Sequence, residues 1–478
     1  MSSFAVGPWA CQNQYSLVNK GGYLRLTTIY RPILALPPEI LAEIFIHCLP
    51  EDPGSPDPKD APYLLCHVCH QFREVAVSIP RLWSSLHVCF DDLDKYVNFC
   101  RNGIETWLLR AKSVPLSLIL DDDWGRECFS FPSPDDTLLP ALLRSSGQWR
   151  SLTLAGSLWA NLFESGSLSG KVPLLENLCT SLPCGAVLLQ DAPKLCVLSV
   201  GRHRPETQVP WHQMTTFHAL YNVDIPSLIE ILQNSTNLLH ASFMFHAPFN
   251  NEPSPLPVSN CRHALLQRLA LIASDWEGTD ERAIPMSLLE FLKLPALKDL
   301  TVKLDPEQSA PVVLTPLLSF LSQPALQLHT LALSLPHPPT MMEDLIKCLE
   351  QVPSLIAFHF HCPSFTGIDI LFTQLTGHVN FLPRLEHLHL LFSCSPPSHL
   401  MPVVIGMLGW RWAAVGITRL QSFGMLHRYA YRRYGSEPPV FVDLLKAESE
   451  FRRLEGEGML LAARGMESAD ADRFWCLL

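Results

Sequence analysis

Two cysteines and two histidines lie close together in Cys66-His-Val-Cys-His70, the pattern of a c-type haem attachment site. Haem attachment requires export, and residues 1–20 lack the charged start and apolar run of an export signal. A structural zinc site requires four ligands, and no second Cys-x-x-Cys accompanies this one. The pattern therefore favours a structural role for these residues inside an amphipathic helix, and we predict no cofactor and no metal.

Four histidines recur at strand spacing in two separate stretches: His359, His361, His387 and His389. Alternate residues of a strand face opposite sides, so His359 and His389 face outward if Phe358 and Leu388 face the core. On adjacent strands the two imidazoles would be neighbours, about 4.8 Å apart. A polar, partly exposed face, a ligand contact or pH-sensitive patch, and a metal site all fit this arrangement. We therefore name these four histidines as possible ligand contacts on a concave face.

Catalytic motifs are not found. The sequence has no Gly-rich phosphate loop, no Gly-x-Ser-x-Gly and no His-Glu-x-x-His. In Gly166-Ser-Leu-Ser-Gly170 the serines stand one place away from the nucleophile position. The acidic run at 121–123 is typical of a solvated turn. We predict no catalytic residue and no enzymatic activity.

Two amphipathic helices are predicted near the start of the chain. The first lies within Leu36–Leu49, where two prolines mark its first turn and apolar residues from Ile40 to Leu49 form one stripe. A proline-rich loop over 51–62 separates it from a second helix over 63–76. A unit of this size buries little core by itself, so we expect it to pack against another surface.

Three blocks follow one another here: Leu36-Pro-Pro-Glu-Ile-Leu-x-x-Ile-Phe45, Val68-Cys-x-x-Phe-Arg-x-Val-Ala76 and Pro80-x-Leu-Trp83. Their order resembles the F-box motif of fungal F-box-like proteins, although the loop between the helices looks longer than in many F-boxes. The resemblance covers residues 33–88. It implies docking on a Skp-type adaptor, and through it on a cullin, by Leu36, Pro37, Ile40, Leu41, Ile44 and Phe45. It also implies a small core, and part of that surface, built by Val68, Cys69, Phe72 and Trp83.

A core of Leu-x-x-Leu-x-Leu, often preceded by proline, recurs along the rest of the chain. The clearest copies are 295–302, 353–360 and 383–390, and weaker ones are 149–154, 173–178, 193–200, 266–271, 328–333 and 420–425. Helical segments separate copies that lie roughly 20 to 30 residues apart, the signature of leucine-rich repeats. Stacked repeats of strand and helix bury a continuous core in a solenoid. An α/β domain whose parallel strands happen to look alike remains an alternative.

Composition limits the partners. The net charge is -11 and no basic stripe occurs, so nucleic acid is not expected. The most membrane-like stretch, 401–408, is far shorter than the roughly 20 residues of a spanning helix. We therefore expect no membrane partner. Fifteen cysteines at irregular spacings indicate reduced thiols, so we expect a cytoplasmic or nuclear location.

The predicted fold class is α/β: a small α-helical F-box-like module followed by an irregular leucine-rich-repeat solenoid. We predict a flexible segment over 1–32, the module over 33–88, repeats over 89–432 and a helical cap over 433–478. The resemblance implies a non-catalytic substrate receptor of an SCF-type (cullin–RING) ubiquitin ligase, whose repeats bind a protein substrate. The alternative is a repeat scaffold, not attached to a ligase, in which the helices serve only as an N-terminal cap.

Overall fold

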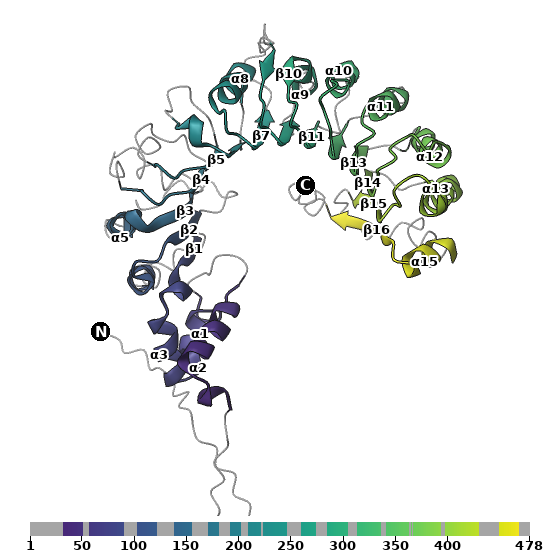
Figure 1. Ribbon diagram of the computed structural model, residues 1–478. Helices are drawn as coiled ribbons and strands as arrows, with labels where there is room; N and C mark the ends of the chain where they lie inside the picture. The colour runs from purple at the N-terminus through teal and green to yellow at the C-terminus, as the bar shows by residue number, and fades with distance from the viewer. Residues whose placement is uncertain are drawn as a thin grey trace, which may run out of the picture. The chain divides into compact units, whose positions relative to one another are not determined.

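The computed structural model describes residues 32–50, 57–89, 103–121, 138–154, 171–180, 192–201, 209–220, 223–245, 260–273, 284–304, 313–335, 341–362, 365, 367–392, 397–429 and 449–467 (Figure 1). The chain divides into two compact units, Met1–Lys194 (unit 1) and Leu195–Leu478 (unit 2). The segment predicted to be flexible, up to residue 31, and the serines at 167 and 169 lie outside the described residues.

Unit 1 begins with short helices: η1 (Pro32–Ala35), α1 (Pro38–His47), α2 (Tyr63–Val68), α3 (His70–Ser78) and η2 (Pro80–Trp83). Helix α1 starts as predicted, because the missing N–H of Pro38 would be unpaired in the first turn anyway. The prediction of one helix over 63–76 is wrong. Cys69 is extended, with φ -163° and ψ 171°, and divides the segment into α2 and α3.

Four parallel strands follow in chain order: β1 (Ser85–Cys89), β2 (Leu116–Asp121), β3 (Trp149–Leu154) and β4 (Asn177–Thr180). Helical residues 103–111, α5 (Leu138–Arg144) and η3 (Ser146–Gln148) lie between them in sequence. Strand β1 begins two residues after Trp83, and the N–H of Ser117 in β2 donates to the carbonyl of Ser84 (2.8 Å). The helical module therefore continues directly into the sheet of unit 1.

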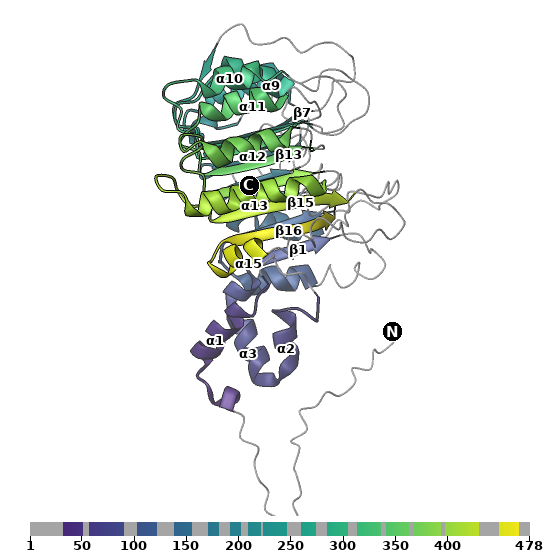
Figure 2. The ribbon, with the colours of Figure 1, turned by 90° about the vertical axis from the view of Figure 1, so that its right-hand side faces the viewer.

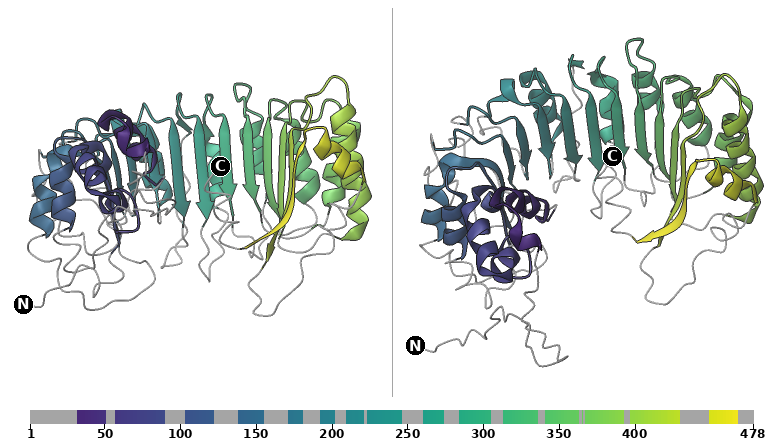
Figure 3. Two further views of the ribbon diagram at one scale, coloured as in Figure 1. Left: turned by 90° about the horizontal axis from the view of Figure 1, so that it is seen from below. Right: turned by 60° about the horizontal axis from the view of Figure 1, so that its bottom comes forward.

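Unit 2 consists of parallel strands that pair in chain order, with helices along one side of them (Figures 1 and 3). The strands are β5 (Val197–Val200), β6 (Thr216–Ala219), β7 (His240–Phe245), β9 (Arg268–Ala273), β11 (Asp299–Lys303), β12 (Thr330–Ser334), β13 (Ala357–Cys362), β14 (His387–Phe392), β15 (Ser422–Tyr429) and β16 (Leu460–Glu467). The sheet face turned away from the helices is called the concave face below.

The helical segments of unit 2 are η5 (Trp211–Gln213), α8 (Ile225–Asn234), α9 (Ile284–Leu288), η7 (Leu289–Phe291), α10 (Thr315–Leu321), α11 (Met341–Glu350), α12 (Ile368–Gly377), η8 (Ser398–Leu400), α13 (Met401–Ala413) and α15 (Ser449–Gly456). Helices α11, α12 and α13 stack one after another along the strands (Figure 2). Two short strands, β8 (Cys261–Arg262) and β10 (Leu292–Lys293), form a separate pair. Helix α13 has 13 residues, and no helix in the described ranges could span a membrane.

A turn with proline at its second position precedes several strands. The N–H of Leu297 donates to the carbonyl of Leu294 (3.1 Å), and Leu355 and Val352 form the same bond (3.1 Å). Proline suits this position because its fixed φ matches the turn. The first two N–H groups after the turn both donate to one carbonyl of the preceding repeat, as Lys298 and Asp299 do to Gln267 (2.8 and 3.0 Å). These repeated contacts make the structure a mixed α/β fold compatible with a solenoid.

The predicted core positions are confirmed. Leu300, Leu331, Phe358 and Leu388 lie opposite one another on successive strands and are fully buried. Strands β1, β6, β7, β8, β10 and β16 were not predicted.

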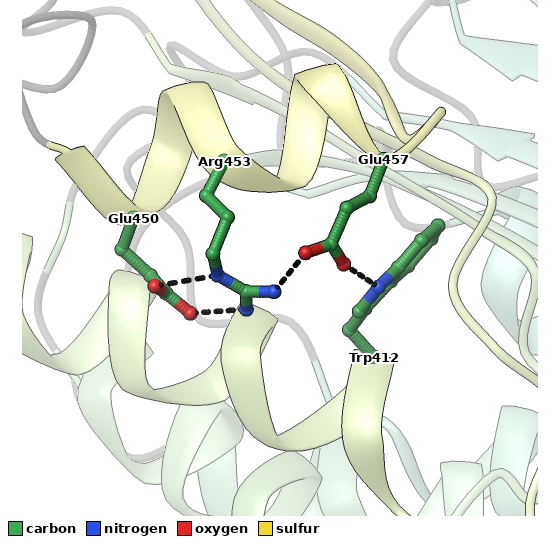
Figure 4. A network of polar contacts seen from close by, with 4 residues as sticks. All are labelled: Trp412, Glu450, Arg453 and Glu457. Atoms are coloured by element: carbon green, nitrogen blue, oxygen red, sulfur yellow. Dashed lines mark hydrogen bonds and ion pairs between the residues drawn. The ribbon is translucent and has the colours of Figure 1, made fainter.

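The predicted C-terminal cap contains α15, whose buried Phe451 and Leu454 hold it in place, followed by the unpredicted β16. Arg453 binds the carboxylates of Glu450 and Glu457, and Glu457 accepts a hydrogen bond from Trp412 of α13 (Figure 4). Arg453 lowers the pKa of both carboxyl groups. Because exposed ion pairs contribute little, the buried residues of α15 account for most of its attachment.

In the turn before β9, the side chain of His263 serves as the hydrogen-bond acceptor, a role that a backbone carbonyl has in several other turns. Its Nδ1 accepts from the N–H groups of Leu266 (3.0 Å) and Leu265 (3.3 Å), so its proton lies on Nε2, which donates to the carbonyl of Ser235 (2.8 Å). The ring is buried. It therefore joins two successive turns.

Replacing His263 with alanine is expected to lower the free energy of unfolding by about 2–3 kcal/mol, because the N–H groups of Leu265 and Leu266 lose their acceptor and the carbonyl of Ser235 keeps only the N–H of Leu238. His263→Asn, which keeps an acceptor and a donor, should recover part of this loss. Urea unfolding of the full chain, with the exposed His399→Ala as control, measures both effects. A loss no larger than that of His399→Ala would contradict the bridging role.

Candidate functional site

Helix α1 presents one apolar edge to solvent and buries another. Ile40 is 49% exposed and Ile44 37% exposed, whereas Leu41 and Phe45 are buried. The buried edge packs on α3, where the rings of Phe45 and Phe72 meet edge-to-face with centroids 4.9 Å apart. The prediction that all of these residues form a docking surface is therefore wrong for Leu41 and Phe45. Residues one apart on a helix point about 100° apart, so a wide stripe can serve both a core and a surface.

The residues flanking this edge are also accessible. Pro37 is exposed and Leu36 is half-buried at the start of α1. On α2, Leu64 and Val68 are exposed one turn apart, while Leu65 is buried. We call Ile40, Ile44, Leu64 and Val68 the outward apolar residues of the module.

Val68, Cys69, Phe72 and Trp83 were predicted to build the module's small core and part of its surface, and they differ in burial. Phe72 and Trp83 are buried, and Cys69 is partly buried at the break between α2 and α3. Val68 is 51% exposed. A continuous helix would have placed Val68 beside Phe72, but the extended backbone at Cys69 ends α2 and leaves Val68 on its outer side.

An aromatic cluster joins the module to the helical residues 103–111. The rings of Trp83, Tyr63 and Trp107 contact one another edge-to-face at centroid distances of 5.0 to 5.4 Å. The guanidinium of Arg110 lies over the Trp83 ring at 4.4 Å, a cation–π contact. Sequence analysis missed Trp107, although its helical spacing from Ile104 and Ala111, which are also buried, was a usable signal.

Cys66 is buried in α2, and Cys69 is partly buried at the break that follows it. Burial raises the pKa of the Cys66 thiol, which disfavours the thiolate that binds metals. Within the described residues, no group of three or more His, Cys, Asp or Glu side chains is arranged to hold a metal ion.

The histidines of β13 and β14 meet on the concave face as the repeat register predicted. His359 and His389 are opposite each other in the sheet, with ring centroids 5.0 Å apart and Nδ1 atoms 3.2 Å apart. His387 lies beside them, on the same strand and face as His389. His361 bonds through Nδ1 with the hydroxyl of Ser334 (2.9 Å).

Strand β15 adds two residues to this group that sequence analysis did not identify. The Ser422 hydroxyl lies 2.8 Å from Nδ1 of His387 and 3.2 Å from Nε2 of His389. Gly424 lies opposite His389, and a Cβ atom at Gly424 would come within 2.8 Å of Cδ2 of that ring. The glycine therefore allows the imidazole to lie directly over the backbone of β15.

The histidines are less accessible than predicted. His359 is 4% exposed and His361 is also buried, so only His387 and His389 are partly exposed. Burial, with smaller effects of His389 and His387, lowers the pKa of His359 to about 3. Burial and His387 also lower the pKa of His389. At neutral pH these two rings are uncharged.

Ser422, His389 and His359 have the spacing of a nucleophile, a base and an orienting group. The third member is a neutral imidazole, however, and cannot stabilise an imidazolium as a carboxylate does. Ser422 is buried, and its backbone belongs to the paired part of β15 that lies opposite β14. The geometry therefore supports a hydrogen-bonded network rather than acyl transfer.

Comparison with known proteins does not identify the chain: no family model and no curated protein matches it. The function therefore has to be inferred from two features, the outward apolar residues of the module in unit 1 and the concave face of unit 2.

Proposed function

We propose that this protein is a substrate-receptor subunit of an SCF-type ubiquitin ligase. Its helical module docks on a Skp-type adaptor, and its repeats bind a protein substrate. The observation that carries this proposal is the divided stripe of α1, where Leu41 and Phe45 complete the module's core and Ile40 and Ile44 remain open to solvent.

Exposed apolar side chains favour association because removing them from water releases about 25 cal/mol per Å² of apolar surface. Ile40 and Ile44 lie one turn apart on α1, and Leu64 and Val68 lie one turn apart on α2. Isolated exposed apolar residues are common on soluble proteins, but each of these two helices presents a pair of them one turn apart. They have the aliphatic character of the adaptor contacts that the F-box resemblance implies.

The connection between the module and the sheet of unit 1 also suits a receptor. No linker separates Trp83 from β1, and the aromatic cluster of Tyr63, Trp83 and Trp107 holds the junction. Covalent attachment of the repeats to a docked module raises the effective concentration of a bound substrate near the adaptor.

A scaffold outside any ligase is the second candidate. The same junction favours it, since a helical module packed against the first strands of unit 1 would also serve as an N-terminal cap. Under this alternative the outward apolar residues have no adaptor to bind.

The test is the double substitution Ile40→Asp and Ile44→Asp in the full chain. We expect binding to a purified Skp-type adaptor to fall at least about 100-fold, because two central apolar anchors are lost. Thermal unfolding should stay close to that of the wild type, because both side chains point outward. Leu41→Asp is unsuitable, since a charge at that buried site would unfold the module.

Leu109→Asp provides the matched control, because Leu109 is an exposed apolar residue of the same unit outside the module. Biolayer interferometry with immobilised adaptor measures all three proteins. Undiminished binding by the double variant would show that the docking surface lies elsewhere. Failure of the wild type to bind any Skp-type adaptor would leave the scaffold as the better reading.

A further inference from the structure

A cluster of hydrogen-bond donors lies on the concave face of unit 2, where β6, β7, β9 and β11 are neighbours. His240, Arg268 and Asp299 are opposite one another in register. They alternate with buried residues of their strands, so they face away from the helices. The adjacent row on the same face contains His218, Ser242, Ala270 and Thr301. We call His218, His240, Ser242, Arg268 and Thr301 the Arg268 cluster.

Asp299 holds Arg268 in a defined orientation. The Nε–H of Arg268 donates to Oδ2 of Asp299 (2.9 Å), and the arginine side chain is 61% exposed. Within the described residues this is the one hydrogen bond of the guanidinium, so its terminal nitrogens Nη1 and Nη2 remain available. Two terminal nitrogens in one plane match the two oxygens of a carboxylate. Because an exposed ion pair is weak, Arg268 can bind a second carboxylate while it keeps the bond to Asp299.

The two histidines of the cluster add donors without adding charge. Burial, and to a smaller extent Arg268, lowers the pKa of His240, and Asp299 opposes this shift only in part. Burial, and to a smaller extent His240, lowers the pKa of His218. Both rings are therefore uncharged at neutral pH, and each uncharged imidazole has one N–H to donate.

Acidic residues are scarce in this part of the sheet, although the chain as a whole is acidic. The chain contains 46 Asp and Glu residues against 35 Lys and Arg residues. Strands β6, β7, β9, β11 and β12 are described at every position, and among their residues one is acidic, Asp299, and two are basic, Arg268 and Lys303. The charge of these strands therefore favours an anionic partner over a cationic one.

We propose that the Arg268 cluster binds a carboxylate side chain of an extended, Asp- or Glu-containing segment of the substrate protein. The terminal nitrogens of Arg268 take both carboxylate oxygens, and the N–H and hydroxyl groups of the neighbouring residues donate to the remaining lone pairs. This inference deepens the proposed function and rests on its assignment of substrate binding to the repeats, because it names the chemistry of the substrate.

The exposure of the cluster decides the kind of partner, since its residues are partly or largely exposed at every position. An exposed ion pair contributes little by itself, so a free carboxylate ion would bind weakly there. A protein segment adds contacts with neighbouring strands. Ala270, between Ser242 and Thr301, has a side chain too short to keep an extended backbone away from the sheet. A single arginine matches the charge of a carboxylate, whereas phosphate groups are bound by arginine clusters.

Binding of fluorescent peptide pools to the full chain, measured by anisotropy, tests the proposal. The peptides of each pool carry glutamate, glutamine or phosphoserine at three fixed positions that alternate with mixed neutral residues. This spacing places the fixed side chains on one face of an extended peptide, so that one of them reaches Arg268 in several registers. At about 50 mM salt we expect the wild type to bind the glutamate pool at least about tenfold more tightly than the glutamine pool.

Arg268→Gln should abolish this preference, and Arg268→Lys should keep only part of it, because an ammonium group lacks the paired donors. Arg262→Gln removes the same charge from an exposed arginine of β8 and is the matched control, which should bind like the wild type. Equal binding of the glutamate and glutamine pools by the wild type, or an unchanged preference in Arg268→Gln, would overturn the proposal. A stronger preference for the phosphoserine pool that Arg268→Gln abolishes would also overturn it, in favour of a phosphorylated segment.

Adaptor binding by the same variants separates this inference from the proposed function. Arg268→Gln should bind the adaptor as the wild type does, because Arg268 belongs to unit 2 and the module to unit 1. A wild type that binds the adaptor but does not prefer the glutamate pool would overturn the role of the Arg268 cluster alone. A wild type that shows the preference but binds no adaptor would support the cluster and overturn the ligase assignment.

Discussion

Replacing Arg411 with methionine is expected to lower the free energy of unfolding of unit 2 by about 3 kcal/mol. Arg411 is fully buried in α13. Its guanidinium donates from Nε to the carbonyl of Leu375 (2.9 Å), from Nη1 to that of Leu382 (2.9 Å) and from Nη2 to that of Phe381 (2.6 Å). One side chain thus donates hydrogen bonds to a carbonyl near the end of α12 and to two carbonyls in the turn that leads to β14.

The magnitude reflects two opposing effects. Methionine fills a similar volume but removes the donor from the carbonyls of Leu375 and Phe381, each at a cost of about 1–3 kcal/mol, whereas the carbonyl of Leu382 keeps the N–H of Leu385 (3.2 Å). Removing the cation relieves its desolvation, which lowers the pKa of Arg411 to about 10 and offsets part of the loss. The carbonyl of Leu375 lies near the C-terminal end of α12, where the helix dipole favours a positive charge.

Hydrogen exchange in peptides from residues 367–392 and 397–429, which report on unit 2 alone, measures the effect, with Arg419→Met as the matched control on an exposed arginine. Arg411→Lys should fall between the wild type and Arg411→Met, because an ammonium keeps the charge but cannot reach three carbonyls from one plane. A loss below about 1 kcal/mol for Arg411→Met would show that water replaces the guanidinium, and the bridging role would be rejected.

The strands around Arg411 could be predicted from sequence, but its role could not. Leu388 and its counterparts belong to a local pattern in which period-2 alternation and a preceding proline determine both strand and register. The partners of Arg411 are backbone carbonyls about 30 residues away. Every residue has a backbone carbonyl, so the sequence does not indicate which ones accept these hydrogen bonds. Strand β7 was missed for a different reason: its core positions hold Ala241 and Phe243 in place of leucines.

The candidate sites show the same limit. The apolar stripe of α1 could be predicted from sequence, but which edge of it is buried depends on where α3 places Phe72. That placement depends on the break at Cys69, which neither glycine nor proline marks. The pairing of His359 with His389 followed from the repeat register. Ser422 and Gly424 lie in the predicted repeat copy at 420–425, but neither residue type by itself indicates a contact with a histidine of the preceding strand.

Replacing Trp83 with alanine is expected to cost unit 1 about 3–5 kcal/mol, the range for truncating a fully buried tryptophan. The indole contacts Tyr63 of α2 and Trp107 of the next helical segment edge-to-face, at 5.4 and 5.0 Å. Its Nε1–H donates to the carbonyl of Ala76 in the last turn of α3 (3.0 Å), which also accepts a longer bond from the N–H of Ile79 (3.4 Å). The substitution therefore creates a cavity and removes the shorter of the two hydrogen bonds to this carbonyl.

Trp83→Phe separates these contributions. Phenylalanine keeps much of the ring contact with Tyr63 and Trp107 but cannot donate to Ala76, so it should cost about 1–2 kcal/mol. Because the chain contains two compact units, a single unfolding midpoint would mix them. Hydrogen exchange in peptides from residues 63–89 and 103–121 isolates unit 1, and Trp410→Ala, at a half-buried tryptophan of unit 2, is the control.

In Trp83→Ala both sets of peptides should lose protection together, because the aromatic cluster joins the module to the helical segment 103–111. Loss of protection in 63–89 alone would mean that the module unfolds separately. The aromatic cluster would then not couple the module to the helical segment, even if adaptor binding by Ile40 and Ile44 were intact. Cooperative unfolding across this junction and adaptor binding at α1 are thus separable properties, because they depend on different residues of unit 1.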